Sequence, residues 1–283
     1  MRNKPAMKAS TGRTRNMLPV HIVLLIGCIT MLFPFYWMIA TSFKTIGESV
    51  QIPPTLWPKA WDPSSYSEVF RVLPMGKLYF NTILLIVLRI VCAVVFSSMA
   101  AYGFAKLNFP FKGPLFFIVI TQQMLPGQVF TIPQYLQLNS MGLLNTHFAL
   151  LYPGIVSAFG TFFLRQFYMS LPNELQEAAL IDGANIGQVF MRIMFPLTKT
   201  ALMALSVFTA IFAYGDMMWP LIVNMQVDMM TLSAGMTSLQ GQFGTKYPLV
   251  MAGATLAMVP MMVLYLFFQK QFIEGIALTG IKA

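Results

Sequence analysis

A run of acidic, small and turn-forming residues near the middle of the chain has the side chains best suited to pairing with another protein. It reads Leu171-Pro172-Asn173-Glu174-Leu175-Gln176-Glu177-Ala178-Ala179-Leu180-Ile181-Asp182-Gly183-Ala184-Asn185. Pro172 is placed to open a helix, and Glu174 and Glu177 follow in its first turns, where the helix dipole favours acidic groups. Gly183 is expected to end that helix in a left-handed conformation. The pattern predicts a short helix outside the bilayer, a turn at Gly183, and a second helix that returns to the membrane.

Glu177 and the two alanines that follow it each have two interpretations. The Glu177 carboxylate can pair with a basic residue of a partner, or it can simply complement the helix dipole, which is worth about 0.3–1 kcal/mol. Ala178 and Ala179 are small enough for a helix seated in a cleft, although alanine also has the highest intrinsic helix propensity. We favour the partner interface for Glu177.

These residues resemble the EAA loop of ABC-importer permeases, and in particular the smaller permease subunit of maltose-type carbohydrate importers. The matching positions are Glu177, Ala178, Ala179, Asp182, Gly183 and Ala184, followed by Ile193 and Pro196. The resemblance implies that a coupling helix carrying the first six of these residues docks into a groove on an ATPase subunit. It further implies a second homologous permease, two copies of the ATP-binding subunit, an external solute-binding protein and a sugar substrate moved by alternating access.

The composition places the chain in a membrane. Of its 283 residues, 57% are hydrophobic and 10% are charged, whereas soluble proteins are about a quarter charged. The net charge of +9 comes from residues dispersed around apolar segments, so a nucleic-acid partner is not indicated. Cys28 and Cys92 lie in apolar runs, where small buried hydrophobic side chains are expected rather than a disulfide or a metal site.

The apolar segments predict an all-α polytopic membrane protein with six transmembrane helices, and the resemblance implies the type I ABC importer permease architecture. A basic tail at residues 1–16 precedes a transmembrane domain over 17–283, with the EAA loop at 171–199. The first apolar run is too long for a signal peptide and lacks a small-residue cleavage site, so it is expected to be retained. The expected spans are about 17–42, 78–105, 113–134, 146–168, 200–223 and 247–268.

The lysines and arginines predict the orientation. This topology places twelve of them on one side: Arg2, Lys4, Lys8, Arg13, Arg15, Lys106, Lys112, Arg165, Arg192, Lys199, Lys270 and Lys282. Five lie on the other: Lys44, Lys59, Arg71, Lys77 and Lys246. The positive-inside rule then puts both termini and the EAA loop in the cytoplasm. The expected location is the bacterial cytoplasmic (inner) membrane.

Four polar residues inside the expected spans are candidates for the translocation pathway. Arg89 and Asp216 are ionisable, and such residues in lipid are costly enough to indicate function or pairing. Counting residues puts Arg89 near the midplane and Asp216 nearer the outer face. Gln122 and Gln123 can hydrogen-bond sugar hydroxyls in a cavity or, as we favour, bind a neighbouring helix. Asp216 can instead serve locally, because Pro220 cannot donate a hydrogen bond to its carbonyl.

Three further segments have family counterparts. Residues 214–220 resemble a family pattern that usually reads Trp-Asn-Asp before Trp-Pro, but Tyr214 and Gly215 replace its first two residues. The external loop that holds Gln240, Gly241, Gln242, Phe243 and Gly244 is similar to one that reaches into the binding protein in maltose-type systems. The tail over 275–283 resembles an extension that inserts between the two ATPases. A flexible connector and a frayed terminus are the alternatives.

No pattern indicates catalysis on this chain. It has no G-x-x-x-x-G-K-[ST] phosphate loop, and neither a nucleophile–base constellation nor metal-ligand spacing is visible. No cofactor is therefore expected here, and ATP and Mg²⁺ belong on the partner ATPase. The alternative function is an ion-coupled secondary transporter, which usually shows inverted repeats with broken helices. No such repeat is visible.

Overall fold

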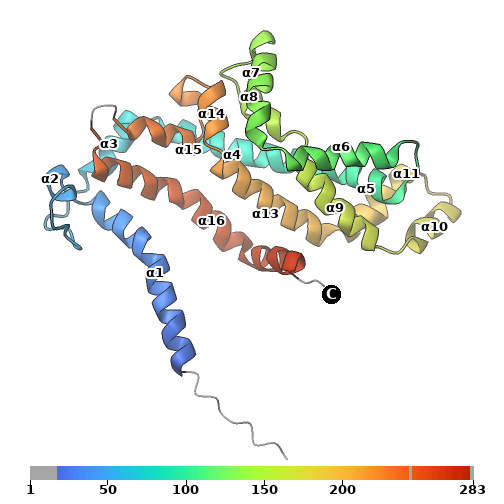
Figure 1. Cartoon of the computed structure of the whole chain (residues 1–283), viewed down its shortest axis with the longest axis horizontal. Coiled ribbons are helices and arrows are strands. Elements are labelled where there is room, and N and C mark those ends of the chain that lie inside the picture. The colour runs from blue at the N-terminus through green and yellow to red at the C-terminus, as the bar shows by residue number, and fades with distance from the viewer. Residues whose placement is uncertain (1–17, 242–243, 281–283) are drawn as a thin grey trace, which may run out of the picture.

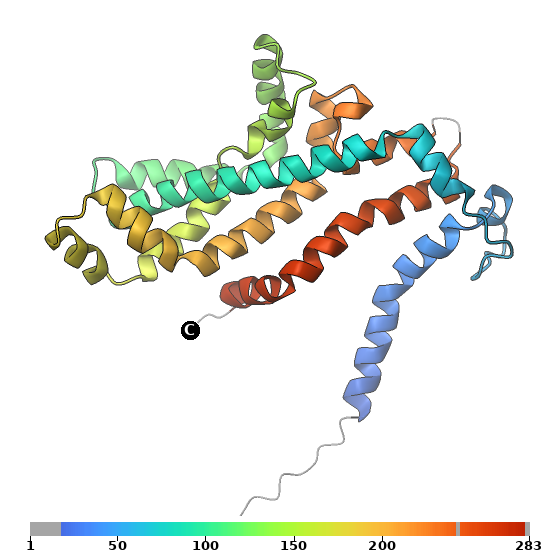
Figure 2. The same cartoon turned by 180° about the vertical axis from the view of Figure 1, so that it is seen from behind.

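The chain folds entirely into helices over the part that the structure describes (Figures 1 and 2). The computed structural model describes residues 18–241 and 244–280, and side chains as far as residue 270. The all-helical class predicted from the sequence is confirmed for these residues. Three helical stretches are long and apolar enough to cross a membrane: Leu18–Ser42, Met75–Lys106 and Tyr247–Lys270. Three bent helix pairs raise the possible total to six crossings if each pair forms one span.

The longest helices are α1 (Leu18–Ser42), α16 (Tyr247–Gly280) and the composite of α4 (Met75–Cys92), η1 (Ala93–Ser97) and α5 (Ser98–Lys106). Only the last three residues of α1 are buried, and that helix leans away from the others (Figure 1). The composite helix runs along most of the bundle (Figure 2). It therefore connects the end of the molecule near α3 with the end near α10.

Three helix pairs are sharply bent. The first bend, of 103°, separates α6 (Lys112–Met124) from η2 (Gly127–Phe130) and α7 (Thr131–Ser140). The second, of 44°, separates α8 (His147–Leu151) and η3 (Tyr152–Gly154) from α9 (Ala158–Ser170). The third, of 75°, separates α11 (Ile186–Val189), η4 (Phe190–Met194) and α12 (Phe195–Leu197) from α13 (Lys199–Gly215). The 103° bend falls at Leu125, which is extended, and Pro126. Since proline disfavours helical backbone in the residue before it, this break is set locally. The expected span 113–134 thus contains a bend, and its membrane boundaries stay a prediction.

The expected span 200–223 also contains a break. Helix α13 ends at Gly215, Asp216 is extended with ψ 101°, and α14 begins at Met218. Pro220 has no N–H to offer the carbonyl of Asp216, which removes one of the bonds that would continue the helix. The shorter elements are α2 (Ile46–Ser49), α3 (Ser64–Val72), α10 (Glu174–Ile181), α14 (Met218–Val223), η5 (Val227–Met229), α15 (Leu232–Gly235) and η6 (Met236–Leu239).

The buried side chains form separate clusters along the bundle. One cluster joins α5, α9, η4 and α13 beside α10 and includes Leu164, Tyr168 and Met194, each 0% exposed. A second lies at the opposite end, where α3, α4, α15 and α16 meet around Leu78 and Leu232. In the segment between α1 and α3, Lys44 is buried, and its Nζ donates to Thr55 O at 2.5 Å.

Candidate functional site

The segment over 171–199, which we call the EAA segment, begins with helix α10 and a turn closed by backbone bonds. Ala184 N donates to Ala179 O at 3.0 Å, and Gly183 N donates to Leu180 O at 3.1 Å. These two bonds form the Schellman arrangement, which requires a left-handed residue at Gly183. Its φ is +85°, so the predicted conformation is confirmed. The turn therefore fixes the angle at which the chain leaves α10.

The next helix starts at once and is also capped. Asn185 and Gln188 form a capping box with two bonds of 2.9 Å, which satisfies two of the free N–H groups at the start of α11. Helix α10 begins at Glu174 rather than at Pro172, and the Asn173 side chain does not cap it. Asn173 Oδ1 instead accepts from Lys106 Nζ at 2.6 Å.

Helix α10 is fastened to α5 by polar bonds. Besides Asn173, Lys106 Nζ reaches Leu171 O at 2.6 Å. Tyr102 Oη donates to Gln176 Oε1 at 3.1 Å. These contacts tie the start and the middle of α10 to the composite helix. These bonds hold α10 against the composite helix that carries Arg89.

The predicted coupling residues do not all face outward. Glu177, Ala178, Asp182 and Gly183 are exposed and Ala184 is half-buried, whereas Ala179 is 7% exposed and belongs to the core cluster around Tyr168. Ala179 is small because it packs against this chain. Exposed apolar side chains lie beside the carboxylates, and Ile181 is 86% exposed.

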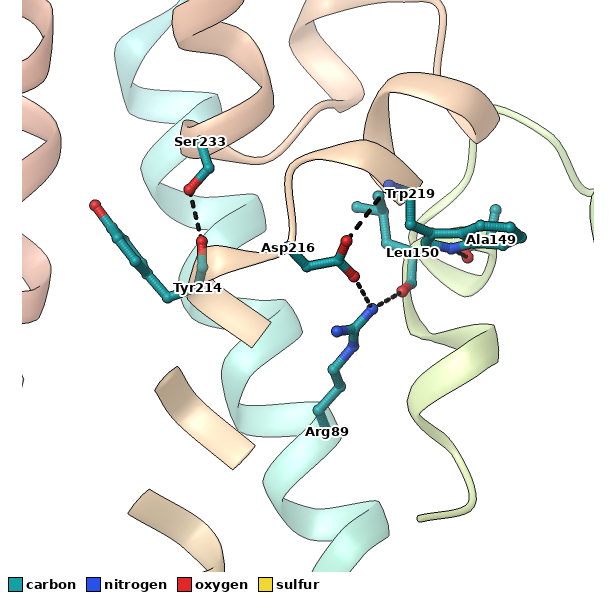
Figure 3. A network of polar contacts seen from close by, with 7 residues as sticks. All are labelled: Arg89, Ala149, Leu150, Tyr214, Asp216, Trp219 and Ser233. Carbon is teal, nitrogen blue, oxygen red and sulfur yellow. Dashed lines mark hydrogen bonds and ion pairs between the residues drawn. The ribbon is translucent and has the colours of Figure 1, made fainter. Parts of the chain in front are cut away.

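Arg89 and Asp216 form an ion pair at the break between α13 and α14 (Figure 3). Arg89 Nη2 lies 2.9 Å from Asp216 Oδ2 and also donates to Leu150 O at 3.0 Å. Asp216 Oδ1 accepts from Trp219 N at 3.4 Å, so the same carboxylate caps α14. The side chains are 9% and 23% exposed. This arrangement includes both interpretations of Asp216, the pairing and the local hydrogen bond at the helix break. The depths of the two residues in the membrane stay a prediction.

Tyr214 and Gly215, the two positions that depart from the family pattern, differ in their contacts with the rest of the chain. Tyr214 Oη donates to Ala257 O, and Tyr214 O accepts from Ser233 Oγ at 2.6 Å (Figure 3). The first bond joins α13 to α16, and the second joins it to α15. An added Cβ at Gly215 would meet nothing within 4 Å. Tyr214 therefore holds the end of α13 in place beside the ion pair.

The two neighbouring glutamines of α6 have different surroundings. Gln123 Nε2 donates to Ala158 O on α9 at 3.3 Å, which is the helix-packing role favoured for it. Gln122 lines a cavity of about 430 Å³. That cavity and one of about 240 Å³, which reaches Asp216 and Trp219, share Gln134 and Pro153 in their walls.

We call these two neighbouring cavities, whose walls share Gln134 and Pro153, the glutamine hollow. Its walls include the polar residues Gln122, Gln128, Thr131, Gln134, Gln137, Tyr152 and Asp216. Of these, sequence reasoning selected only Gln122 and Asp216. The available signal for Gln134, Gln137 and Tyr152 was their polarity inside a stretch from Gly113 to Leu164 that has no charged residue. The bend at Leu125 is what brings them together.

The remaining candidates lie at the ends of the molecule. Gln240 is exposed, Gly241 approaches Gly244 O so closely that any Cβ would clash, and Gln242 and Phe243 lie outside the described residues. Helix α16 extends to Gly280, and the last residues of the tail lie outside the described range as well. Among the described residues no group of three or more His, Cys, Asp or Glu side chains could hold a metal ion. Cys28 is exposed on α1, against the expectation of burial, because only the end of α1 packs against the chain.

Comparisons with known proteins give a consistent picture. The family model described as "Binding-protein-dependent transport system inner membrane component" matches residues 93–277. The arabinooligosaccharides transport system permease protein AraQ of Bacillus subtilis is 32% identical over 254 residues, covering 89% of this chain and 90% of AraQ. The sn-glycerol-3-phosphate transport system permease protein UgpE of Yersinia pestis is 32% identical over 264 residues, covering 90% and 94%.

Two further similarities extend over almost the whole chain. The diacetylchitobiose uptake system permease protein NgcG of Streptomyces coelicolor is 26% identical over 278 residues, covering 97% of this chain and 92% of NgcG. A chain from the crystal structure of a bacterial ABC transporter involved in the import of the acidic polysaccharide alginate has the same fold, with a TM-score of 0.79 and 21% identity. It covers 94% of this chain and 100% of its own.

Proposed function

Because the chain belongs to the family of binding-protein-dependent transport system inner membrane components, we propose that it forms half of the translocation pathway of a sugar importer. The family and its named members are transport permeases, not enzymes, and the secondary-transporter alternative is not favoured. The resemblance drawn from the EAA residues is confirmed. Sugar as cargo is supported by the names of two relatives, which refer to arabinooligosaccharides and diacetylchitobiose.

Such a permease works with a partner permease, an ATPase and a binding protein. The finer composition that we propose is one homologous permease, two copies of the ATP-binding subunit with ATP and Mg²⁺ bound there, and one external solute-binding protein. The described residues contain no group that could hold a metal ion. We propose that the energy for transport enters this chain through a contact with the ATPase.

We propose that the EAA segment is this contact. The observation that carries the proposal is that α10 exposes Glu177, Ala178 and Asp182 on one side while Lys106 and Tyr102 fasten it to the composite helix on the other. Because the turn at Gly183 is closed by backbone bonds, α10 and α11 move together. Closure of the ATPases would move this unit, and the composite helix would carry the movement to Arg89 and the glutamine hollow.

Charge reversal at Glu177 tests the contact, with Glu174 as the matched control. Both carboxylates are exposed and lie in the first turn of α10. If Glu177 only complements the helix dipole, which is worth about 0.3–1 kcal/mol, Glu177→Lys should be no more harmful than Glu174→Lys. Glu174→Lys loses the same contribution and also the attraction between Glu174 and Lys106. If Glu177 pairs with the ATPase, Glu177→Lys should uncouple transport from ATP hydrolysis much more strongly. Sugar uptake and the yield of the assembled complex would be measured together, and normal transport by Glu177→Lys would remove it from the interface.

We propose that both termini and α10 face the cytoplasm and that the loop at Gln240 faces the binding protein. The charge bias supports this orientation, and α10 and η6 lie toward opposite ends of the bundle (Figure 1). In a background without Cys28 and Cys92, Gln240→Cys should react with an impermeant thiol reagent added outside, and Glu174→Cys only after permeabilisation. The binding protein should shield Gln240→Cys; labelling that it leaves unchanged would make this loop a simple connector.

The C-terminal tail is the least supported contact. We propose, from the family resemblance, that residues 275–283 reach the ATPases. The tail would then act at the same end of the molecule as α10, toward which α16 runs (Figure 2).

A further inference from the structure

The glutamine hollow has two amides in its walls, those of Gln122 and Gln134, that make no hydrogen bond with any described residue. We propose that this hollow is a substrate-contact site on this subunit and that it takes an uncharged saccharide. The inference rests on the proposed sugar-import function and adds the place of contact and the charge class of the cargo.

The amides of Gln122 and Gln134 make no hydrogen bond with any described residue, although they line the two parts of the hollow. Their neighbour Gln123 shows what a packing glutamine does, since its amide donates to Ala158 O. The amide of Gln137 is held by Tyr152, whose hydroxyl donates to Gln137 Oε1 at 2.7 Å and leaves the Gln137 NH₂ group free. Gln122 is exposed and Gln134 half-buried in the single chain, so both amides are open to a ligand in the hollow.

The groups in the walls match the hydroxyls of a sugar. A hydroxyl both donates and accepts hydrogen bonds, and a glutamine amide offers two donors and one acceptor. The aromatic side chains Phe130 and Tyr152 add apolar surface to the larger cavity. Its volume of about 430 Å³ falls within the range of about 300–1,000 Å³ that is typical of ligand pockets.

The charges in the walls disfavour an anion. The charged residue that lines the hollow is Asp216, and its carboxylate already pairs with Arg89 at 2.9 Å. The Arg89 side chain is only 9% exposed and also donates to Leu150 O. A phosphate or a uronate in the hollow would therefore lose water without gaining a free cation, which costs far more than moving a neutral hydroxyl.

The predicted topology, with Lys112 at the cytoplasmic end of its span, puts the hollow near the middle of the membrane. Gln122 is ten residues from Lys112 along α6, or about 15 Å at 1.5 Å per residue, which is half of the ~30 Å hydrocarbon thickness. The chain is non-helical beside it, at Leu125–Pro126 and at Asp216. Irregular backbone at this depth is tolerated where protein covers it or where it lines a water-filled cavity.

The test uses the complete importer in liposomes with its solute-binding protein. Uptake of radiolabelled arabinotriose, diacetylchitobiose, sn-glycerol 3-phosphate and digalacturonate would be measured alongside ATP hydrolysis. In Gln122→Leu/Gln134→Leu, we expect the neutral sugar carried per ATP to fall about ten-fold, since two hydrogen bonds of modest net value are lost. Gln122→Asn/Gln134→Asn, which keeps both amides, should retain more transport. The control Gln123→Leu should stay within about two-fold of wild type, because its single bond is to the protein.

Three results would overturn the proposal. Unchanged transport per ATP in the double leucine variant would show that the amides do not contact cargo. A fall in complex yield in that variant, but not in Gln123→Leu, would assign the hollow to contact with the partner permease. A wild-type complex that carries an anion and neither neutral sugar would reject the charge class while leaving the permease function intact. Failure of the wild type to carry any saccharide would instead contradict the proposed sugar-import function.

Discussion

The two ends of the stretch from Arg89 to Lys106 differ in how their polar groups are paired. At the Lys106 end, Tyr168 is 0% exposed, and its hydroxyl bonds Ser98 Oγ at 2.7 Å and accepts from Thr198 Oγ1 at 3.4 Å. That one hydroxyl joins α9, α5 and the bend before α13. At the Arg89 end, the helices are broken, and the side-chain amides of Gln122 and Gln134 make no hydrogen bond with any described residue.

This difference matches two mechanical tasks. A fully packed and hydrogen-bonded region transmits displacement, because close-packed interiors deform little. A region with broken helices and free amides can change its walls as cargo enters and leaves. The ion pair of Arg89 and Asp216 lies between them, since it neutralises the carboxylate beside the hollow and holds α13 against α4. The comparison therefore predicts that this pair matters more for stability than other polar contacts of the chain.

The largest effect is expected from Arg89→Met. This variant leaves the Asp216 carboxylate, only 23% exposed, without its cation, and removing one partner of a buried pair typically costs about 3–5 kcal/mol. The double variant Arg89→Met/Asp216→Asn should recover most of the loss, since no charge remains and the carbonyl oxygen of the new amide can still accept from Trp219 N. Thermal unfolding of the purified complex in detergent would measure both.

A second substitution reaches the same pair from the other side. A Cβ at Gly154 would lie 2.7 Å from Arg89 Nε, so Gly154→Ala should push the guanidinium away and destabilise the complex in the same direction. If Arg89→Met unfolds at the wild-type temperature, the pair is not the junction between the two regions, and the comparison fails.

The meeting of Arg89 and Asp216 could have been predicted from the sequence with a different count. Arg89 lies 17 residues before Lys106, and Asp216 lies 17 residues after Lys199. Since both lysines were expected at the cytoplasmic ends of their spans, helical rise puts both charges at the same depth, about 25 Å from that end. Counting Arg89 from the external face and Asp216 from the cytoplasmic face, along spans of different length, concealed that the sequence places the two residues at the same depth.

The EAA segment and the hollow differ in how much the sequence shows. The fold class followed from composition, and the turn at Gly183 followed from local residue types, because a Schellman turn depends on neighbours in the chain. The inward direction of Ala179 depends on the core around Tyr168 and was not predicted. The hollow depends on a 103° bend that brings Gln122 near Gln134 and Tyr152, and no periodicity in the sequence fixes that angle.

An intermediate effect is expected from Gly183→Ala, which tests whether the EAA segment must be rigid. A Cβ there would meet nothing within 4 Å, so the cost is the left-handed backbone alone, about 1–2 kcal/mol. Gly113→Ala is the control, because Gly113 is equally open but lies in α6 without positive φ. We expect lower transport per ATP in Gly183→Ala and unchanged transport in Gly113→Ala. Equal behaviour of the two variants would mean that the turn does not transmit movement.

The smallest effect is expected from Asp228→Asn, which removes an exposed ion pair for comparison with the buried one. Asp228 Oδ2 lies 2.8 Å from Lys77 Nζ, and the side chains are 42% and 64% exposed. The hydrogen bond from Lys77 holds the pKa of the Asp228 carboxyl below its ordinary value of 3.8. Because the folded-state pKa is lowered, the pair stabilises the protein above pH 3.8 and loses that contribution as pH falls through the lower, folded-state pKa.

The unfolding temperatures of wild type and Asp228→Asn should thus differ slightly at pH 7 and converge in acid. The difference should also shrink in high salt, since exposed charges are screened within about 10 Å at 0.1 M ionic strength. The deficit of Arg89→Met should persist in the same salt, because burial protects that pair from screening. If salt removes both deficits equally, Arg89 and Asp216 are exposed to solvent like the surface pair, and the packed junction inferred between the two regions does not exist.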